Sequence, residues 1–227
     1  EMEEYEYEQE FMCSWQAAVR GAFFGKVMKE ADDEGRITDV PYDPALPVYT
    51  SCDLGIADAF AVIWWQVSPG GQYRCIDYEE YHNMSLPEVI GDMRKKPYER
   101  YEMHIAPHDI KVRELGTGSS RLEIAQQNGI RYQTARNLPL MDGIDATRNL
   151  IRKAWFDKER CKMLVNHLQL YRADVIEATG VLSHRPRHDH TSHGADAARY
   201  FAVEMGQRNG QTWGSGINYD MLDRMAI

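Results

Sequence analysis

The sequence predicts an α/β domain built on a mixed sheet, with helices on both faces. Three stretches rich in β-branched and aromatic residues, 48–55, 60–68 and 73–82, follow one another with short connections, as in an antiparallel meander. Helical and strand patterns alternate after them, which favours further strands added to the same sheet. The 227 residues suffice to bury a core without disulfide staples.

The first half of the chain leads into this meander. The opening run EMEEYEYEQEFMCSW is acidic and then apolar, and we expect a linker or partner-facing segment leading into a short helix, with a solvated leader as the alternative. The turn-rich stretch DDEGRITDVPYDPALP is expected to be a loop. The turn GIADA joins the first two strands, and SPGGQ at 68–72 forms a tight hairpin into the third.

In the second half of the chain, strand patterns and helical patterns alternate. We expect strands at 101–107, 130–135 and 161–165, and helices at 86–96, 119–129, 138–156, 167–178 and 193–206. The helix at 138–156 would carry an apolar face that includes Ile144, Ile151 and Trp155. The Gly- and Asn-rich tail at 207–227 is expected to be mobile.

The net charge and the cysteine spacing exclude few classes of function. The net charge is −9, yet residues 1–34 hold ten acidic and three basic residues, a balance of −7, so the remainder carries only −2. Near-neutrality over most of the chain leaves room for basic patches that bind nucleic acid. The four cysteines lie far apart with no CxxC pair, which indicates neither a zinc knuckle nor a disulfide framework and favours a reducing compartment. The apolar run AFAVIWW is too short to cross a bilayer, so we expect no membrane association.

Acidic residues follow or close several of the expected strands and open the last helix. Asp53 ends a strand in SCDLGIADAF, although taken alone this stretch is better explained by an ordinary Asp/Gly turn. Asp109 comes just beyond another strand, where sites of open sheets gather. In HDHTSHGADAARY, Ser192 suits a helix N-cap, while His193 and Asp196 share a face that differs from the apolar stripe. The stretch GTGSSR lacks the Gly-Lys-Ser/Thr ending of a nucleotide-binding loop.

Taken together, these motifs resemble a known family. DLGIAD on a first strand, PHD with RELGTGSSR after a later strand, and SHGADAARY opening a late helix are similar to the nuclease domain of the large terminase subunit of tailed bacteriophages. The resemblance runs from about Phe11 to Met205 and implies a ribonuclease H-like fold. It also implies three segments: a linker at 1–46 that follows an ATPase domain, the nuclease domain at 47–206, and the tail. No nucleotide-binding signature of that ATPase domain is present in the sequence.

The resemblance implies roles for individual residues. The three acids that bind divalent metal in the family fall on Asp53, Asp109 and Asp196, and His193 matches a histidine that some members keep in the active site. Asp58 falls where several members have an additional acid near the metals. The sequence departs from relatives with paired acids on the last helix, because Ala197 follows Asp196.

Clustered carboxylates of this kind require a cation or bound protons. Two carboxylates about 4 Å apart repel by roughly 4 kcal/mol at an effective dielectric constant near 20. Hard oxygen ligands favour Mg²⁺ or Mn²⁺ over zinc. A pair of such ions would stabilise the attacking and leaving oxygens of an in-line displacement at phosphorus.

The function implied is a metal-dependent endonuclease that cuts double-stranded phage DNA concatemers during genome packaging. Its partners would be DNA, its own ATPase domain, the portal and the small terminase subunit, at the procapsid in the host cytoplasm. Basic side chains that would contact phosphates, with a solvated surface as the alternative, are Lys111, Arg113, Arg121, Arg148, Arg152, Arg185 and Arg187. The stretch HRPRHDH would be a DNA guide or a disordered loop. Two other hypotheses are a different ribonuclease H-like nuclease, such as a resolvase or transposase, and a non-catalytic docking module for the packaging motor.

Overall fold

The computed structural model describes residues 21–55, 59–113, 118–176 and 181–208. The expected acidic leader and most of the expected mobile tail lie outside these residues, so both stay predictions. Within them a seven-stranded sheet has the order β1-β7-β4-β3-β2-β5-β6. Its strands are β1 (Ile37–Thr38), β2 (Val48–Leu54), β3 (Ala59–Val67), β4 (Tyr73–His82), β5 (Tyr101–Ala106), β6 (Tyr132–Thr134) and β7 (Ala154–Asp157).

The central meander matches the prediction. β3 pairs antiparallel with both β2 and β4, while β5 and β6 extend the sheet in parallel beyond β2. On the other side, β7 pairs in parallel with β4, and β1 with β7. The mixed sheet therefore consists of an antiparallel centre with parallel strands added at each edge.

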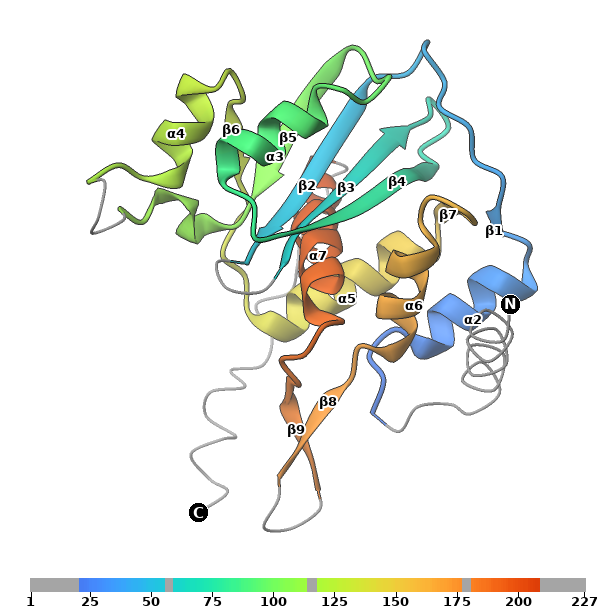
Figure 1. Ribbon diagram of the computed structural model, residues 1–227. Coiled ribbons are helices and arrows are strands. Elements are labelled where there is room, and N and C mark those ends of the chain that lie inside the picture. The colour runs from blue at the N-terminus through green and yellow to red at the C-terminus, as the bar shows by residue number, and fades with distance from the viewer. Residues whose placement is uncertain (1–20, 56–58, 114–117, 177–180, 209–227) are drawn as a thin grey trace, which may run out of the picture.

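Helices cover both faces of the sheet, as predicted (Figure 1). One face packs against α3 (Leu86–Met93) and α4 (Arg121–Gln127), and its core includes Trp64 and Ile76. The other face packs against α5, α6 and α7, and its core includes Trp65 and Phe201, whose rings stack with centroids 4.5 Å apart. The remaining helical segments have the bounds α2 (Gly25–Asp33), the 3-10 turn η1 (His108–Lys111), α5 (Leu140–Ile151), α6 (Lys162–Leu170) and α7 (Ser192–Arg208).

One expected helix is too long in the prediction. The helix expected at 138–156 ends at Ile151, and Ala154–Asp157 forms the strand β7 instead. Trp155 therefore does not share a helix face with Ile144; it packs against the core on the α3 side, whereas Phe156 packs on the α5 side. A strand covered on both faces is continuously apolar, so hydrophobic spacing alone cannot separate it from a helix end.

The strand predicted at 161–165 is also wrong, and of the helix predicted at 167–178 only residues 167–170 are helical in the part of the chain that the structure describes. Lys162–Leu170 is one helix, α6, rather than a strand followed by a helix, because Leu164, Val165 and Leu168 recur at helical spacing and are buried. The chain then forms a two-stranded antiparallel hairpin of β8 (Ala173–Ile176) and β9 (Val181–Pro186). The first three residues of the stretch HRPRHDH, 184–186, therefore belong to a strand, and the other four do not. Among the described residues no helix combines the length and hydropathy that a membrane span requires.

Candidate functional site

The register of the central strands puts two acidic residues in one row. Asp53, next to last in β2, is opposite Ala61 of β3, which is in turn opposite Glu80 of β4. Residues in register across adjacent antiparallel strands face the same side of the sheet. Gly55 then lets the chain turn, since a Cβ there would lie 2.2 Å from the carbonyl oxygen of Ala59. The row therefore lies close to the end of β2, and Asp53 in it is beside the first turn of α7.

Asp53 contacts the predicted histidine. Oδ2 of Asp53 lies 3.0 Å from Nδ1 of His193, and the two side chains are 19% and 7% exposed. Burial raises the pKa of Asp53, and the negative charge of Asp196 raises it further, against the opposing effects of His193 and Arg199. A buried carboxylate with a raised pKa is less stable as an anion here than in water. The site therefore favours an added positive charge beside Asp53.

A tight turn fixes the start of α7. Oδ1 of Asp189 accepts hydrogen bonds from the backbone N–H and the hydroxyl of Thr191, at 3.0 and 2.6 Å. Although burial opposes it, these bonds hold the pKa of Asp189 below its ordinary value. The helix begins at Ser192, so this residue is not the N-cap that the sequence suggested; its hydroxyl bonds within the turn instead. His193 is consequently held in the first turn.

Close packing determines how near the first turn of α7 lies to the sheet. A Cβ on Gly194 would lie 2.8 Å from the hydroxyl oxygen of Tyr78 in β4 and 3.0 Å from Cδ1 of Leu164 in α6. Real Cβ contacts are almost never this short, so only glycine fits without movement of its neighbours. The backbone of α7 therefore approaches the sheet closely just before Asp196.

Asp196 lies one turn into α7 and is held by a residue of its own helix and by one that follows α6. Its Oδ1 accepts from Nε and Nη2 of Arg199, at 3.2 and 3.0 Å, and from the hydroxyl of Tyr171, at 3.4 Å. The Asp196 side chain is 24% exposed and that of Arg199 18%. Asp196 is therefore a carboxylate oriented by protein donors near Asp53.

Asp109 approaches from the neighbouring strand. β5 runs parallel to β2, and Ser51 is opposite Ile105, so Asp109 in η1 follows the same end of the sheet that carries Asp53. Asp109 is exposed. Burial raises the pKa of Tyr200, against the effect of Arg199, and the charges of Asp196, Asp53 and Asp109 each raise it further. One tyrosine hydroxyl thus experiences the field of all three predicted acids.

The structure adds a buried acid that sequence reasoning missed. Glu80 accepts a hydrogen bond from Tyr78 and has Oε1 3.2 Å from Nδ1 of His167, without the angle of a hydrogen bond. Although burial opposes it, the neighbouring His167 and Tyr78, together with His193, lower the pKa of Glu80. Strand alternation places Glu80 on the same side as Tyr78, but only the pairing register shows that it shares a row with Asp53.

The chemistry of the donors fits a hydrated divalent cation better than a closed metal cage. Within the described ranges no three His, Cys, Asp or Glu side chains gather closely enough to enclose a metal. Magnesium usually needs only one or two carboxylates, with water and substrate phosphates completing its shell. Asp53 and Asp196 can supply these two, and Asp109 lies at the same end of the sheet.

The predicted basic residues are in different situations. Lys111 and Arg113 are exposed beside Asp109, with Arg113 3.7 Å from Glu123. Arg121 donates to the carbonyl oxygen of Leu54 at 3.2 Å, which ties α4 to the end of β2. On α5 and just after it, Arg148 donates to Phe23 and Asp145, and Arg152 donates to Asn149. Before α7, Arg187 lies 3.7 Å from Asp189, and Arg185 is exposed. Asp58 lies outside the described residues.

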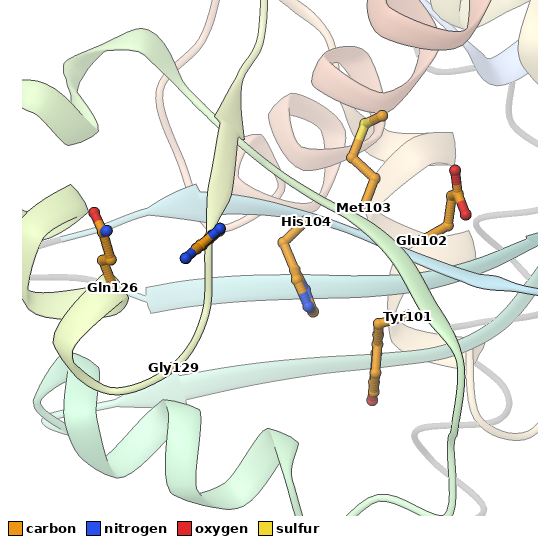
Figure 2. A pocket seen from close by; sticks show the side chains of 7 residues that line it. Tyr101, Glu102, Met103, His104, Gln126 and Gly129 are labelled. Carbon is orange, nitrogen blue, oxygen red and sulfur yellow. The ribbon is translucent and has the colours of Figure 1, made fainter.

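A separate hollow lies at the other end of β5. It has a volume of about 560 Å³ and is bordered by Tyr101, Glu102, Met103, His104, Gln126, Gly129 and Arg131 (Figure 2). His104 stacks on Tyr101, with ring centroids 4.9 Å apart. Because Tyr101 begins β5 and Asp109 follows its end, this hollow is distinct from the carboxylate site.

Comparison with known proteins gives similarity only at the level of structure. No protein-family model and no curated protein matches the sequence. The chain is similar to the large terminase from the thermophilic bacteriophage D6E, with 20% identity and a TM-score of 0.64 over 82% of this chain and 45% of that one. The chain thus spans less than half the length of that terminase.

Two isolated nuclease domains match over most of both chains. The nuclease domain of the g2p large terminase from bacteriophage SPP1, solved with bound Mn, has 19% identity and a TM-score of 0.53 over 72% of this chain and 86% of that one. The large terminase nuclease from the thermophilic phage G20c, solved with bound cobalt, has 13% identity and a TM-score of 0.55 over 80% and 96%. The chain therefore has the ribonuclease H-like fold of large terminase nuclease domains, as the sequence predicted.

Proposed function

We propose that this chain is the nuclease part of a large terminase subunit, a divalent-metal-dependent endonuclease that cuts double-stranded phage DNA concatemers during packaging. The observation that carries this proposal is that Asp196 of α7 lies near enough to Asp53, at the end of β2, for its charge to raise the pKa of Asp53, in a sheet with the terminase nuclease fold. Asp109 comes to the same end from the strand beside β2. Relatives in fold that were solved with Mn or cobalt support a divalent cation here.

Asp53 and Asp196 would hold the cations, Mg²⁺ or Mn²⁺ and two in number, with Asp109 and Asp58 as further ligands. When bound, the ions supply positive charge that polarises the scissile phosphate and offsets the charge of the leaving oxygen. His193 holds Asp53 in place through Nδ1.

DNA would be held chiefly by its phosphates. Lys111 and Arg113, exposed beside Asp109, are the first candidates for such contacts, and Arg185 and Arg187 flank the start of α7. Arg121 supports the end of β2 through its contact with Leu54 in addition to any role in DNA binding. Binding through phosphates releases counterions, so affinity should fall steeply as salt concentration rises.

The full-length protein would pair this domain with an ATPase domain and act with the portal and the small terminase subunit. It would act at the procapsid portal in the host cytoplasm. Support comes from the D6E large terminase, of which this chain matches less than half. Structures solved with ADP and with ATP-gamma-S belong to that same terminase.

Supercoiled plasmid incubated with the protein and Mn²⁺, Mg²⁺ or a chelator tests the proposal. We expect nicked and linear DNA with metal and none with chelator. Asp53→Asn and Asp196→Asn should abolish cutting while circular dichroism shows an intact fold. Asp33→Asn, which removes an exposed carboxylate paired with Lys29 on α2, is the matched control and should cut normally.

Each other hypothesis has its own outcome in this assay. Supercoils that persist with either metal at high protein concentration favour a docking module. Cutting confined to branched DNA would favour a resolvase. Cutting that survives in either asparagine variant removes that residue from the catalytic site.

A further inference from the structure

The hydrogen bonds to Asp196 are one-sided. Nε and Nη2 of Arg199 and the hydroxyl of Tyr171 all reach Oδ1, at 3.2, 3.0 and 3.4 Å. Among the described residues no hydrogen bond reaches Oδ2. The carboxylate is thus fixed through one oxygen, and the other is left for a partner that is not part of the described chain.

Arg199 is built into the fold rather than resting on its surface. Its side chain is only 18% exposed, and the guanidinium lies 4.8 Å from the ring centroid of Tyr200. Gly143 on α5 leaves room for the aliphatic part of the Arg199 side chain. A Cβ on residue 143 would lie 2.8 Å from Cδ and 3.1 Å from Cγ of Arg199. An exposed pair three residues apart on a helix needs no such space from a second helix.

Tyr171 approaches Oδ1 from a different element. It directly follows α6, is 2% exposed, and stacks on Phe24 with ring centroids 5.6 Å apart. Its hydroxyl therefore has little freedom. Donors from α7 and from the end of α6 converge on the same oxygen, which restricts rotation of the carboxylate about its χ angles.

We propose that Arg199, assisted by Tyr171, is a positioning residue that fixes Oδ1 of Asp196 so that Oδ2 is offered to the divalent cation. This inference rests on the proposed function. Groups that orient a metal-binding carboxylate typically contribute 10-fold to 100-fold in metal affinity. The planar guanidinium suits this role because Nε and Nη2 are rigidly spaced and both reach Oδ1, a fixed geometry that the freely rotating ammonium of lysine does not reproduce.

A competing effect of Arg199 has the opposite sign. Its positive charge repels a divalent cation, so a residue that acted only through charge would weaken metal binding, and its removal would strengthen it. The geometry favours positioning because both nitrogens engage the same oxygen instead of covering the two oxygens of the carboxylate. The sign of the change in affinity distinguishes the two effects.

Isothermal titration of Mn²⁺ into the full chain tests the inference. We expect Arg199→Met to weaken Mn²⁺ binding by about 10-fold to 100-fold, and Arg199→Lys to restore little of the loss. Tyr171→Phe should weaken binding less, since its bond to Oδ1 is the longest of the three. Lys29→Met is the control, because it removes a cation from an exposed intrahelical pair on α2 and should leave the affinity unchanged.

Plasmid cleavage at increasing Mn²⁺ provides a second readout. For Arg199→Met the half-saturating metal concentration should rise by the same factor, and excess Mn²⁺ should restore cutting. A fold that had simply collapsed would not recover with metal. Thermal melts identify any variant that does not fold, in which case Arg199→Lys and Tyr171→Phe carry the test.

The failure of this inference differs from that of the proposed function. Mn²⁺ affinity in Arg199→Met that equals or exceeds that of the natural chain overturns the positioning role, while the nuclease assignment stands if Asp196→Asn still loses the metal. A natural chain that binds no Mn²⁺ overturns the proposed function and this inference with it.

Discussion

The half-buried imidazole of His104 should make the fold sensitive to mild acid. His104 lies in β5, where Nδ1 is 2.7 Å from the hydroxyl oxygen of Thr50 in β2 and the ring stacks on Tyr101. Burial lowers the pKa of His104 from 6.5 to about 4. The unfolded chain therefore takes up a proton below about pH 6.5, whereas the folded chain does so only near pH 4.

The size of the effect follows from the two pKa values. Stability from this group is complete above pH 6.5 and is lost as the pH falls from 6.5 towards 4. Since one pKa unit corresponds to about 1.4 kcal/mol, the whole window amounts to about 3 kcal/mol, of which about 2 kcal/mol is lost between pH 7 and pH 5. That is a large share of the free energy of unfolding of a typical domain.

Urea unfolding at a series of pH values measures this loss. The natural chain should lose about 2 kcal/mol more than His104→Gln between pH 7 and pH 5, because glutamine does not titrate in this range. Thr50→Val tests the cause: it removes the hydroxyl but leaves the ring buried, so the pH dependence should persist. Equal pH dependence in the natural chain and His104→Gln would refute the reasoning, and a loss of pH dependence in Thr50→Val would assign the effect to the hydrogen bond instead.

Two glycine substitutions test the packing at the site. Gly194→Ala would put a methyl group 2.8 Å from the hydroxyl oxygen of Tyr78, so we expect the first turn of α7 to shift. Thermal unfolding should then reveal a loss of stability of roughly 1–3 kcal/mol, and plasmid cleavage should fall. Normal cleavage by this variant would contradict the expectation. Gly55→Ala would meet the carbonyl oxygen of Ala59 at 2.2 Å and should cost more stability still, whereas Gly91→Ala on α3, with no atom within 4 Å, should stabilise by up to about 1 kcal/mol.

The sequence predicts the central meander and the strands β5 and β6 well, but it misses β7 and the hairpin of β8 and β9. The expected strand at 73–82 matches β4, since its boundaries are marked by the tight SPGGQ turn and by polar residues after His82. The error at 161–178 arose where short apolar runs fit a helix and a strand equally. Packing decides such cases: Leu164 and Leu168 lie in the same core cluster as residues of α2 and α7, and this information is not local.

The candidate site shows the same division. Asp53, Asp109 and Asp196 could be selected as acids at strand and helix ends, and the family resemblance assigned their roles. The side chains that orient these acids could not be selected from the sequence. Arg199 follows Asp196 by three residues, which only suggests a surface pair, and Tyr171 is 25 residues away in sequence. Their convergence on one oxygen depends on how α6 and α7 pack.

The two sides of α7 have opposite energetic roles. Its polar side brings Asp196 near Asp53, and the pKa of Asp53 is raised by burial first and by the charge of Asp196 second, so the site disfavours the carboxylate anion. Its apolar side compensates, because Phe201 is fully buried and stacks on Trp65, and burying an aromatic side chain of this size stabilises by roughly 1.5–3 kcal/mol. The helix can therefore hold the acids together before a cation arrives. A divalent cation would then add stability to a site whose geometry the core has already fixed, so the metal-dependent gain in melting temperature should disappear in Asp53→Asn.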